Sequence, residues 1–182
     1  MGKILLSLLL ALARLLPCCG QWVAVDLRDE THAMITMGAF FYAHKDLFIA
    51  LRDELWAMEK YEYFYFRQSQ GDIDISACTM EPDENGHGYP TIELDQVEPS
   101  LLHNVEAYFD LLNPDRYCAI GLDHWGSVGN NINLDRVVAF EFGFLDKPGN
   151  KIVYIVYSPK YRDHFVARLG GDWYLDSHSV VF

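Results

Sequence analysis

Glu141 is the residue of this sequence whose setting best suits acid–base chemistry. It lies in an alternating run, 136–145, in which large apolar side chains occupy every second position. Because the side chains of a strand point to opposite faces in turn, Glu141 shares its face with the small residues Ala139 and Gly143. A carboxylate above small residues predicts a shallow depression, and partial burial of a carboxylate suits it to proton transfer. The alternative is a solvent-facing carboxylate on a half-exposed strand.

Two polar residues lie close enough in the sequence to complete such a site. Asp123 and His124 begin a Gly- and Asn-rich segment, 123–134, whose composition predicts a loop. A loop beside the strand that carries Glu141 could bring either side chain to the rim of the depression. This arrangement predicts a small hydrolase that uses Glu141 and His124.

Tyrosine-rich strands offer a second kind of site, for binding rather than catalysis. The run YEYFYFRQSQ (61–70) predicts a strand with Tyr61, Tyr63 and Tyr65 on one face, and Tyr154 lies in a later predicted strand. Tyrosine combines a large rigid ring with a polar hydroxyl group, and protein interfaces are enriched in it. We therefore predict that these four residues bind a partner. The alternative is structural, because tyrosine also packs well when it is half-buried in a sheet.

The sequence contains none of the standard catalytic or metal-binding motifs. The patterns H-E-x-x-H, C-x-x-C and G-x-S-x-G are absent, as is a phosphate-binding glycine loop. The seven histidines are scattered, and no two stand at the spacing of zinc ligands. The runs EPDENG and NNINLD lack the alternating oxygen ligands and the distant Glu of a calcium loop. The sequence therefore predicts no metal site and no cofactor.

Two amphipathic helices are the clearest elements that would position these residues. Apolar side chains recur at helical spacing over 45–60 and again over 99–112. Pro99 suits the first turn of the second helix, where its missing N–H would have had no partner in the helix. Residues 21–42 fit helix and strand about equally.

The strand signals surround these helices. Residues 61–70 and 72–77 predict a hairpin, because the second run alternates Asp or Ser with Ile or Ala after a Gly-Asp turn. Pro, Gly and Asn predict a loop over 81–90. The remaining predicted strands are 91–95 at a sheet edge, 116–122, 136–145, 151–158 and 173–182.

Together these elements predict an α+β fold. We expect an antiparallel sheet of about five to seven strands, with the two amphipathic helices on one face. Tight links such as DKPGN favour antiparallel neighbours, and no helical crossover separates the last four strands. No linker or low-complexity segment divides residues 21–182, so we expect a single domain there.

The charge of the chain restricts its partners. It carries 14 Lys or Arg against 26 Asp or Glu, a formal net charge of −12. Nucleic-acid binding depends on Lys and Arg contacts with phosphates, so this composition argues against it. It also argues against docking on anionic lipid. An acidic surface favours solubility and can also steer a basic protein towards the chain.

Residues 1–20 resemble an export signal. A short basic start at Lys3 precedes an apolar run, and Cys18 and Gly20 are small enough for a cleavage site before Gln21. The run is shorter than the roughly 20 apolar residues of a membrane-spanning helix, so we expect no span in the mature chain. Arg14 is unusual within such a run, and the alternative is a first helix of a cytosolic domain. Lipid attachment at Cys18 or Cys19 is disfavoured, because no small residue stands just before the cysteine.

Two cysteines, Cys78 and Cys118, remain after removal of this segment. An even number of cysteines in an oxidising compartment is compatible with a disulfide. The alternation of the strands argues against a bond, because Cys118 groups with Ile120 and Leu122 on the core side whereas Cys78 groups with Asp72 and Asp74.

Three functions are compatible with these observations. The first is an exported, non-enzymatic acidic binding module of the cell envelope or a secreted protein, with a basic protein as its partner. The second is a cytosolic acidic inhibitor, of the immunity type, that covers a basic toxic enzyme. The third is the hydrolase built on Glu141 and His124.

Overall fold

The chain has the predicted α+β fold. A computed structural model describes residues 30–69, 72–112, 117–123, 136–143, 151–160 and 165–179. The helices are α2 (Glu30–Ala43), α3 (Lys45–Trp56) and α4 (Pro99–Asp110), with a short 3-10 helix, η1 (Leu94–Gln96). The strands are β1 (Tyr61–Ser69), β2 (Asp72–Thr79), β3 (Tyr117–Asp123), β4 (Val137–Gly143), β5 (Lys151–Tyr157), β6 (Ala167–Gly170) and β7 (Trp173–Ser179). Residues 1–20, with Cys18 and Cys19, lie outside the described residues.

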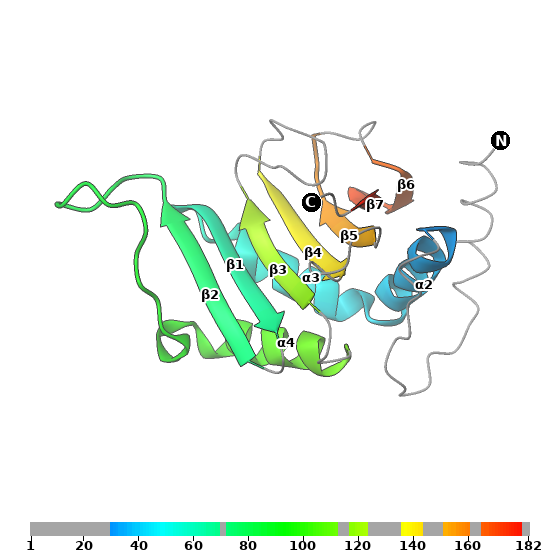
Figure 1. Ribbon diagram of the computed structural model, residues 1–182, viewed down its shortest axis with the longest axis horizontal. Helices are drawn as coiled ribbons and strands as arrows, with labels where there is room; N and C mark the ends of the chain where they lie inside the picture. The colour runs from blue at the N-terminus through cyan, green and yellow to red at the C-terminus, as the bar shows by residue number, and fades with distance from the viewer. Residues whose placement is uncertain are drawn as a thin grey trace.

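The strands of the described residues form one antiparallel sheet in the order β2-β1-β3-β4-β5-β7-β6 (Figure 1). The predicted hairpin of β1 and β2 is confirmed, with Ser69 opposite Asp72 across the turn. Strand β6 is too short, at four residues, to have given an alternating signal in the sequence. The sheet therefore ends in the long strand β2 on one side and in the short strand β6 on the other.

The described residues contain one α-helix more than the two that were predicted. Helices α3 and α4 lie where the apolar spacing placed them, and α3 ends at Trp56 rather than at Lys60. Helix α2 is a third helix in a segment that sequence patterns left undecided. Its apolar residues occur on all sides of the helix, so no period stands out. Its side chains are nonetheless part of the core, and Met37 is fully buried.

The predicted edge strand over residues 91–95 is wrong. Residues 91–93 pair with no strand, and the chain then turns into η1. A capping box causes the turn, because the Glu93 side chain accepts from the Gln96 backbone and the Gln96 side chain accepts from the Glu93 N–H at 3.0 Å. These reciprocal bonds satisfy backbone groups that a strand would have used for pairing.

Two apolar clusters lie on opposite faces of the sheet, which we call the Phe140 face and the Glu141 face after neighbouring residues of β4. Side chains of α2, α3 and α4 join the cluster on the Phe140 face. Phe140 is fully buried there, with its ring centroid 4.7 Å from that of Phe48 on α3 and 5.6 Å from that of Tyr108 on α4. The cluster on the Glu141 face is smaller and comprises Val137, Ala139, Ile152, Tyr154, Val156, Phe165 and Tyr174.

Both cysteines of the described residues are buried, and neither is in a disulfide. Cys118 belongs to the cluster on the Phe140 face, as its alternation predicted. Cys78 lies two strands away on β2, where its thiol donates to a Glu62 carboxylate oxygen at 3.6 Å. Among the described helices, none is long and apolar enough to cross a membrane.

Candidate functional site

Glu141 lies on β4 with Ala119 of β3 and Tyr154 of β5 directly beside it. The small residues along its own strand are covered: Ala139 is 1% exposed, and a Cβ on Gly143 would stand 2.9 Å from an Ile152 side-chain carbon. Glu141 itself is half-buried.

The side chains of the two residues predicted to act with Glu141 lie outside the described part of the structure. His124 lies outside the described residues, and of Asp123 only the backbone is described, at the end of β3 opposite Val137. A pairing of Glu141 with either residue stays a prediction. Sequence reasoning missed a second acid on the same face of the sheet. Asp176 of β7 is buried and lies opposite Tyr154, which in turn lies opposite Glu141.

Two of the four predicted binding tyrosines are half-buried and two are buried. Tyr63 and Tyr65 are half-buried on the Glu141 face, with ring centroids 5.9 Å apart. The prediction that Tyr61 shares their face is wrong. The pairing register with β2 shifts between Tyr61 and Tyr63, and this bulge turns Tyr61 into the cluster on the Phe140 face. There the ring centroid of Tyr61 lies 4.8 Å from that of Phe64. Tyr154 is 4% exposed, so neither it nor Tyr61 offers much surface to a partner.

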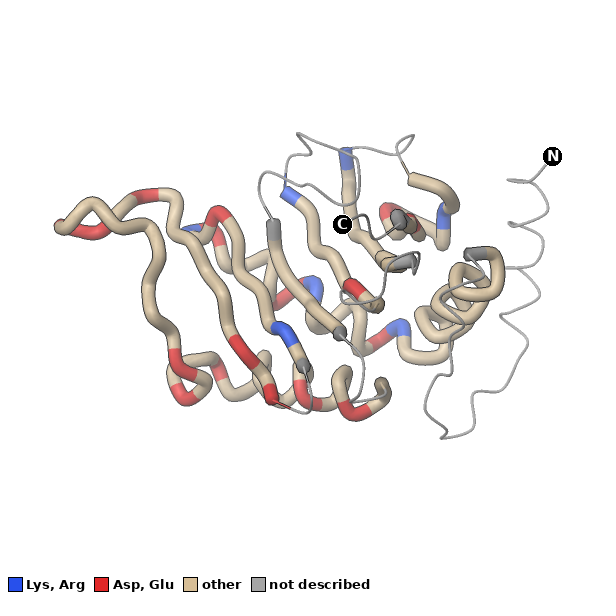
Figure 2. The backbone as a smooth tube through the Cα atoms, viewed as in Figure 1, with Lys and Arg blue, Asp and Glu red and all other residues tan. Residues whose placement is uncertain are grey.

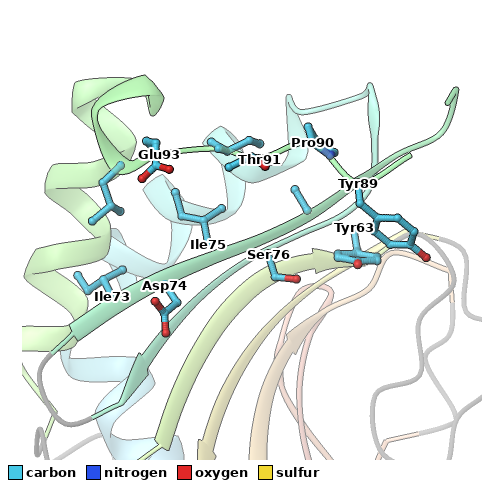
Figure 3. Close-up of a pocket in the computed structure, with 12 residues that line it drawn as sticks. Tyr63, Ile73, Asp74, Ile75, Ser76, Tyr89, Pro90, Thr91 and Glu93 are labelled. Atoms are coloured by element: carbon cyan, nitrogen blue, oxygen red, sulfur yellow. The ribbon is translucent and has the colours of Figure 1, made fainter. Parts of the chain in front are cut away.

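An open groove of about 520 Å³ runs along the outer edge of β2 (Figure 3). Residues 73–77 of β2 form one wall, and the extended segment 89–94 forms the other. Tyr63 and Tyr89 stand at the same end of the groove, and Ile75 lies below Thr91. Of the predicted site residues, only Tyr63 lines this groove.

The second wall is anchored at both ends by local hydrogen bonds. At its start, the Gly88 carbonyl accepts from the Thr79 N–H at 2.6 Å and from the Thr79 hydroxyl at 3.3 Å. At its end, the segment runs into the capping box of η1. The loop before Gly88 is closed by Asp83, whose carboxylate accepts from the backbone N–H groups of Asn85 at 2.9 Å and His87 at 2.8 Å. The groove is therefore held open by its own chain.

Hydrogen bonding in this loop also affects the charge of Asp83. The bond from the His87 backbone, together with those from Asn85, lowers the pKa of the Asp83 carboxyl, and these bonds outweigh the opposing effect of burial. Asp83 is thus held in its charged form in the loop that leads from β2 to the second wall.

Both walls of the groove carry acidic side chains and no basic ones, while Arg67 of β1 lies opposite Asp74 on the inner side of β2. From Gln68 to Asp115 the chain contains no Lys or Arg, and both walls of the groove fall within this stretch. The eleven acids of the stretch are Asp72, Asp74, Glu81, Asp83, Glu84, Glu93, Asp95, Glu98, Glu106, Asp110 and Asp115. Figure 2 shows acidic residues on β2, on the loop that follows it and on the approach to α4. A long run without a basic residue is a sequence signal that could have located this site.

Two large apolar side chains are conspicuously exposed in the described part of the chain, and both flank this loop. Met80 is 45% exposed directly after β2, and Tyr89 is 71% exposed at the end of the groove. Exposed apolar side chains that gather in one place commonly mark an interaction site.

A second cavity, of about 530 Å³, lies between α3 and the turn from β6 to β7. Its guanidinium group, Arg52, is already occupied: it pairs with Asp53 at 2.7 Å and lies 4.7 Å from the ring centroid of Tyr157. Lys45 and Asp172 also line this cavity, so it carries charges of both signs, whereas the walls of the acidic groove carry only one.

Among the described residues, no three His, Cys, Asp or Glu side chains are placed together so that they could hold a metal ion. No protein-family model matches the chain, and no curated protein or solved structure matches it. Its function must therefore be inferred from the residues of the site.

Proposed function

We propose that the chain is a non-catalytic, acidic protein-binding module that binds a basic segment of a partner protein in the groove beside β2. The observation that carries this proposal is the groove itself, whose two walls belong to a 48-residue stretch, 68–115, without Lys or Arg. A cleft lined by one sign of charge concentrates ligands of the opposite sign and raises their rate of association.

Aromatic side chains complement the charge. Tyr63 and Tyr89 stand at one end of the groove, where their rings can pack on the aliphatic part of a Lys or Arg side chain or face its charged group. Such contacts supply apolar area and leave the tyrosine hydroxyls in water.

Binding of a simple basic polypeptide tests the proposal. We would titrate poly-L-lysine of about 20 residues and, separately, poly-L-glutamate of equal length into the protein and measure heats of binding. Poly-L-lysine should bind, and its affinity should fall with added salt, whereas poly-L-glutamate should not bind.

Matched variants locate the binding. Asp74→Asn combined with Glu93→Gln removes one charge from each wall, while Glu106→Gln removes one on the exposed side of α4. At about 0.2–1 kcal/mol for each exposed ion pair, the double variant should bind poly-L-lysine about 2- to 30-fold more weakly. If Glu106→Gln weakens binding by as much per charge removed as the double variant does, the whole surface, not the groove, attracts the polycation.

The compartment distinguishes the two forms that this function can take. We infer export from residues 1–20, which makes the partner an envelope or extracellular protein. Retention of these residues would favour the cytosolic inhibitor of a basic enzyme instead. The intact mass of the protein isolated from its own cell gives the answer: export predicts a chain that begins near Gln21, and a chain that still carries Met1 or Gly2 contradicts it.

A further inference from the structure

The outer edge of β2 has backbone groups available for pairing. β2 is the end strand of the sheet and pairs only with β1 among the described strands. In an antiparallel strand, the N–H and C=O groups of alternate residues point to the same side. The Met80 N–H bonds the Lys60 carbonyl on the β1 side, and the Thr79 N–H bonds Gly88 on the opposite side. By alternation, Ile73, Ile75 and Ala77 direct their backbone groups outward, into the groove.

The segment on the far side of the groove leaves these groups open. Segment 88–94 bonds β2 at Thr79 and then departs from it, so no described residue makes a further backbone bond to the outer edge. Unpaired N–H and C=O groups along a strand edge are a template for another strand. The groove thus presents three outward-facing residues at alternate positions, the repeat that an added strand would match.

The side chains of β2 specify what an added strand would carry. On the Glu141 face β2 presents Asp72, Asp74 and Ser76, and on the Phe140 face it presents the apolar residues Ile73, Ile75 and Ala77. Side chains that lie directly opposite on neighbouring strands interact, and opposite charges are favourable there whereas like charges are not. A complementary strand therefore alternates basic with apolar residues.

We propose that the groove binds its ligand by strand addition: an extended segment that alternates Lys or Arg with apolar residues pairs with the outer edge of β2. This inference rests on the proposed function, since it specifies the conformation and the pattern of the same basic partner. A second copy of this chain is disfavoured as the added strand, because pairing β2 with β2 would bring the carboxylates of two acidic strands close together on one face.

Synthetic peptides test the pattern separately from the charge. The probe is an eight-residue peptide of alternating Lys and Val, capped at both ends, and it is titrated into the intact chain. The control has the same composition as a block of four Lys followed by four Val. The alternating peptide should bind at least about tenfold more tightly, because only it can set every Lys on the acidic side while its backbone pairs.

Backbone methylation tests the pairing itself. Two further peptides carry N-methyl groups on alternate residues, one on the odd and one on the even positions, with all charges kept. A strand paired along one edge uses only one of these sets, so one peptide should lose about tenfold or more in affinity and the other should bind like the parent. In addition, binding of the parent peptide should slow hydrogen exchange at the amides of Ile73, Ile75 and Ala77.

The outcomes separate the two proposals. If all basic peptides bind alike and both methylated peptides bind like the parent, strand addition is overturned while a basic ligand stands. If no basic peptide binds, the proposed function fails and strand addition fails with it. Protection that appears elsewhere than along β2 would also overturn strand addition.

Discussion

Gly121→Ala is a sensitive test of the aromatic surface on the Glu141 face. Gly121 of β3 lies opposite Tyr65 of β1, and the tyrosine ring lies across its backbone. A Cβ on Gly121 would stand 2.1 Å from Tyr65 Cδ1 and 2.6 Å from Cγ. These atoms are at the root of the ring, so a small swing of its far end would not relieve the clash. The ring must leave its position.

The magnitude follows from two opposing effects. Overpacking of this kind costs about 1–3 kcal/mol of unfolding free energy. The lower backbone entropy of alanine in the unfolded chain returns about 0.5–1 kcal/mol. We therefore expect Gly121→Ala to destabilise the protein by about 0–2.5 kcal/mol when Tyr65 is present. In a Tyr65→Ala background the clash is gone, and the same substitution should be neutral or stabilising by up to about 1 kcal/mol.

The assay is urea unfolding of the wild type, both single variants and the double variant, analysed as a double-mutant cycle. The coupling between positions 121 and 65 should be about 1–3 kcal/mol. Gly143→Ala is the control, because its Cβ would meet Ile152 instead, and its effect should be the same in both backgrounds. An equal cost of Gly121→Ala with and without Tyr65 would refute the reasoning.

Three further predictions concern the core and one thiol. Phe109→Ala should cost about 3–5 kcal/mol in urea unfolding, because Phe109 is 1% exposed on α4; a cost below about 1 kcal/mol would show that it faces solvent. Tyr108→Phe should leave stability unchanged or raise it by up to about 1 kcal/mol, since the buried hydroxyl has no hydrogen-bond partner among the described residues, and a clear loss would reveal one. Burial, and next the Glu62 carboxylate, raise the pKa of the Cys78 thiol, so its alkylation should require a higher pH than that of an ordinary thiol. Glu62→Gln should move the midpoint of the alkylation rate against pH to lower pH. An unmoved midpoint would contradict the coupling between Glu62 and Cys78.

Periodicity predicted the elements that have one buried side. In α3 the buried residues Phe48, Leu51 and Leu55 recur at helical spacing, so the pattern could be read without the structure. Helix α2 could not be recognised in this way, because its apolar residues surround it. Strand β4 is buried on both faces apart from Glu141, and its alternation was nevertheless readable because Phe140 and Phe142 occupy one face and Ala139 and Gly143 the other.

The candidate site was less accessible to sequence reasoning. Tyr63 was predicted because alternation places it beside Tyr65, but the bulge that removes Tyr61 from that face is a feature of pairing and leaves no pattern in one strand. Tyr89 lies in a segment whose composition predicts only a loop, and its approach to β2 depends on the Thr79–Gly88 bonds. The capping pair Glu93 and Gln96 was the one local signal against a strand at 91–95.

Charge reversal tests the central claim, that the groove beside β2 binds a basic segment, most directly. The double variant carries Asp72→Lys and Asp74→Lys on β2, which leave the Glu93 capping box intact, and the control carries Glu106→Lys and Asp110→Lys at two exposed acids of α4. Affinities are measured for the alternating Lys–Val peptide and for its Glu–Val counterpart. We expect the double variant to lose the Lys–Val peptide and to gain the Glu–Val peptide, while the control keeps the preference of the wild type. An unchanged preference in the double variant, or the same exchange in the control, would contradict the claim.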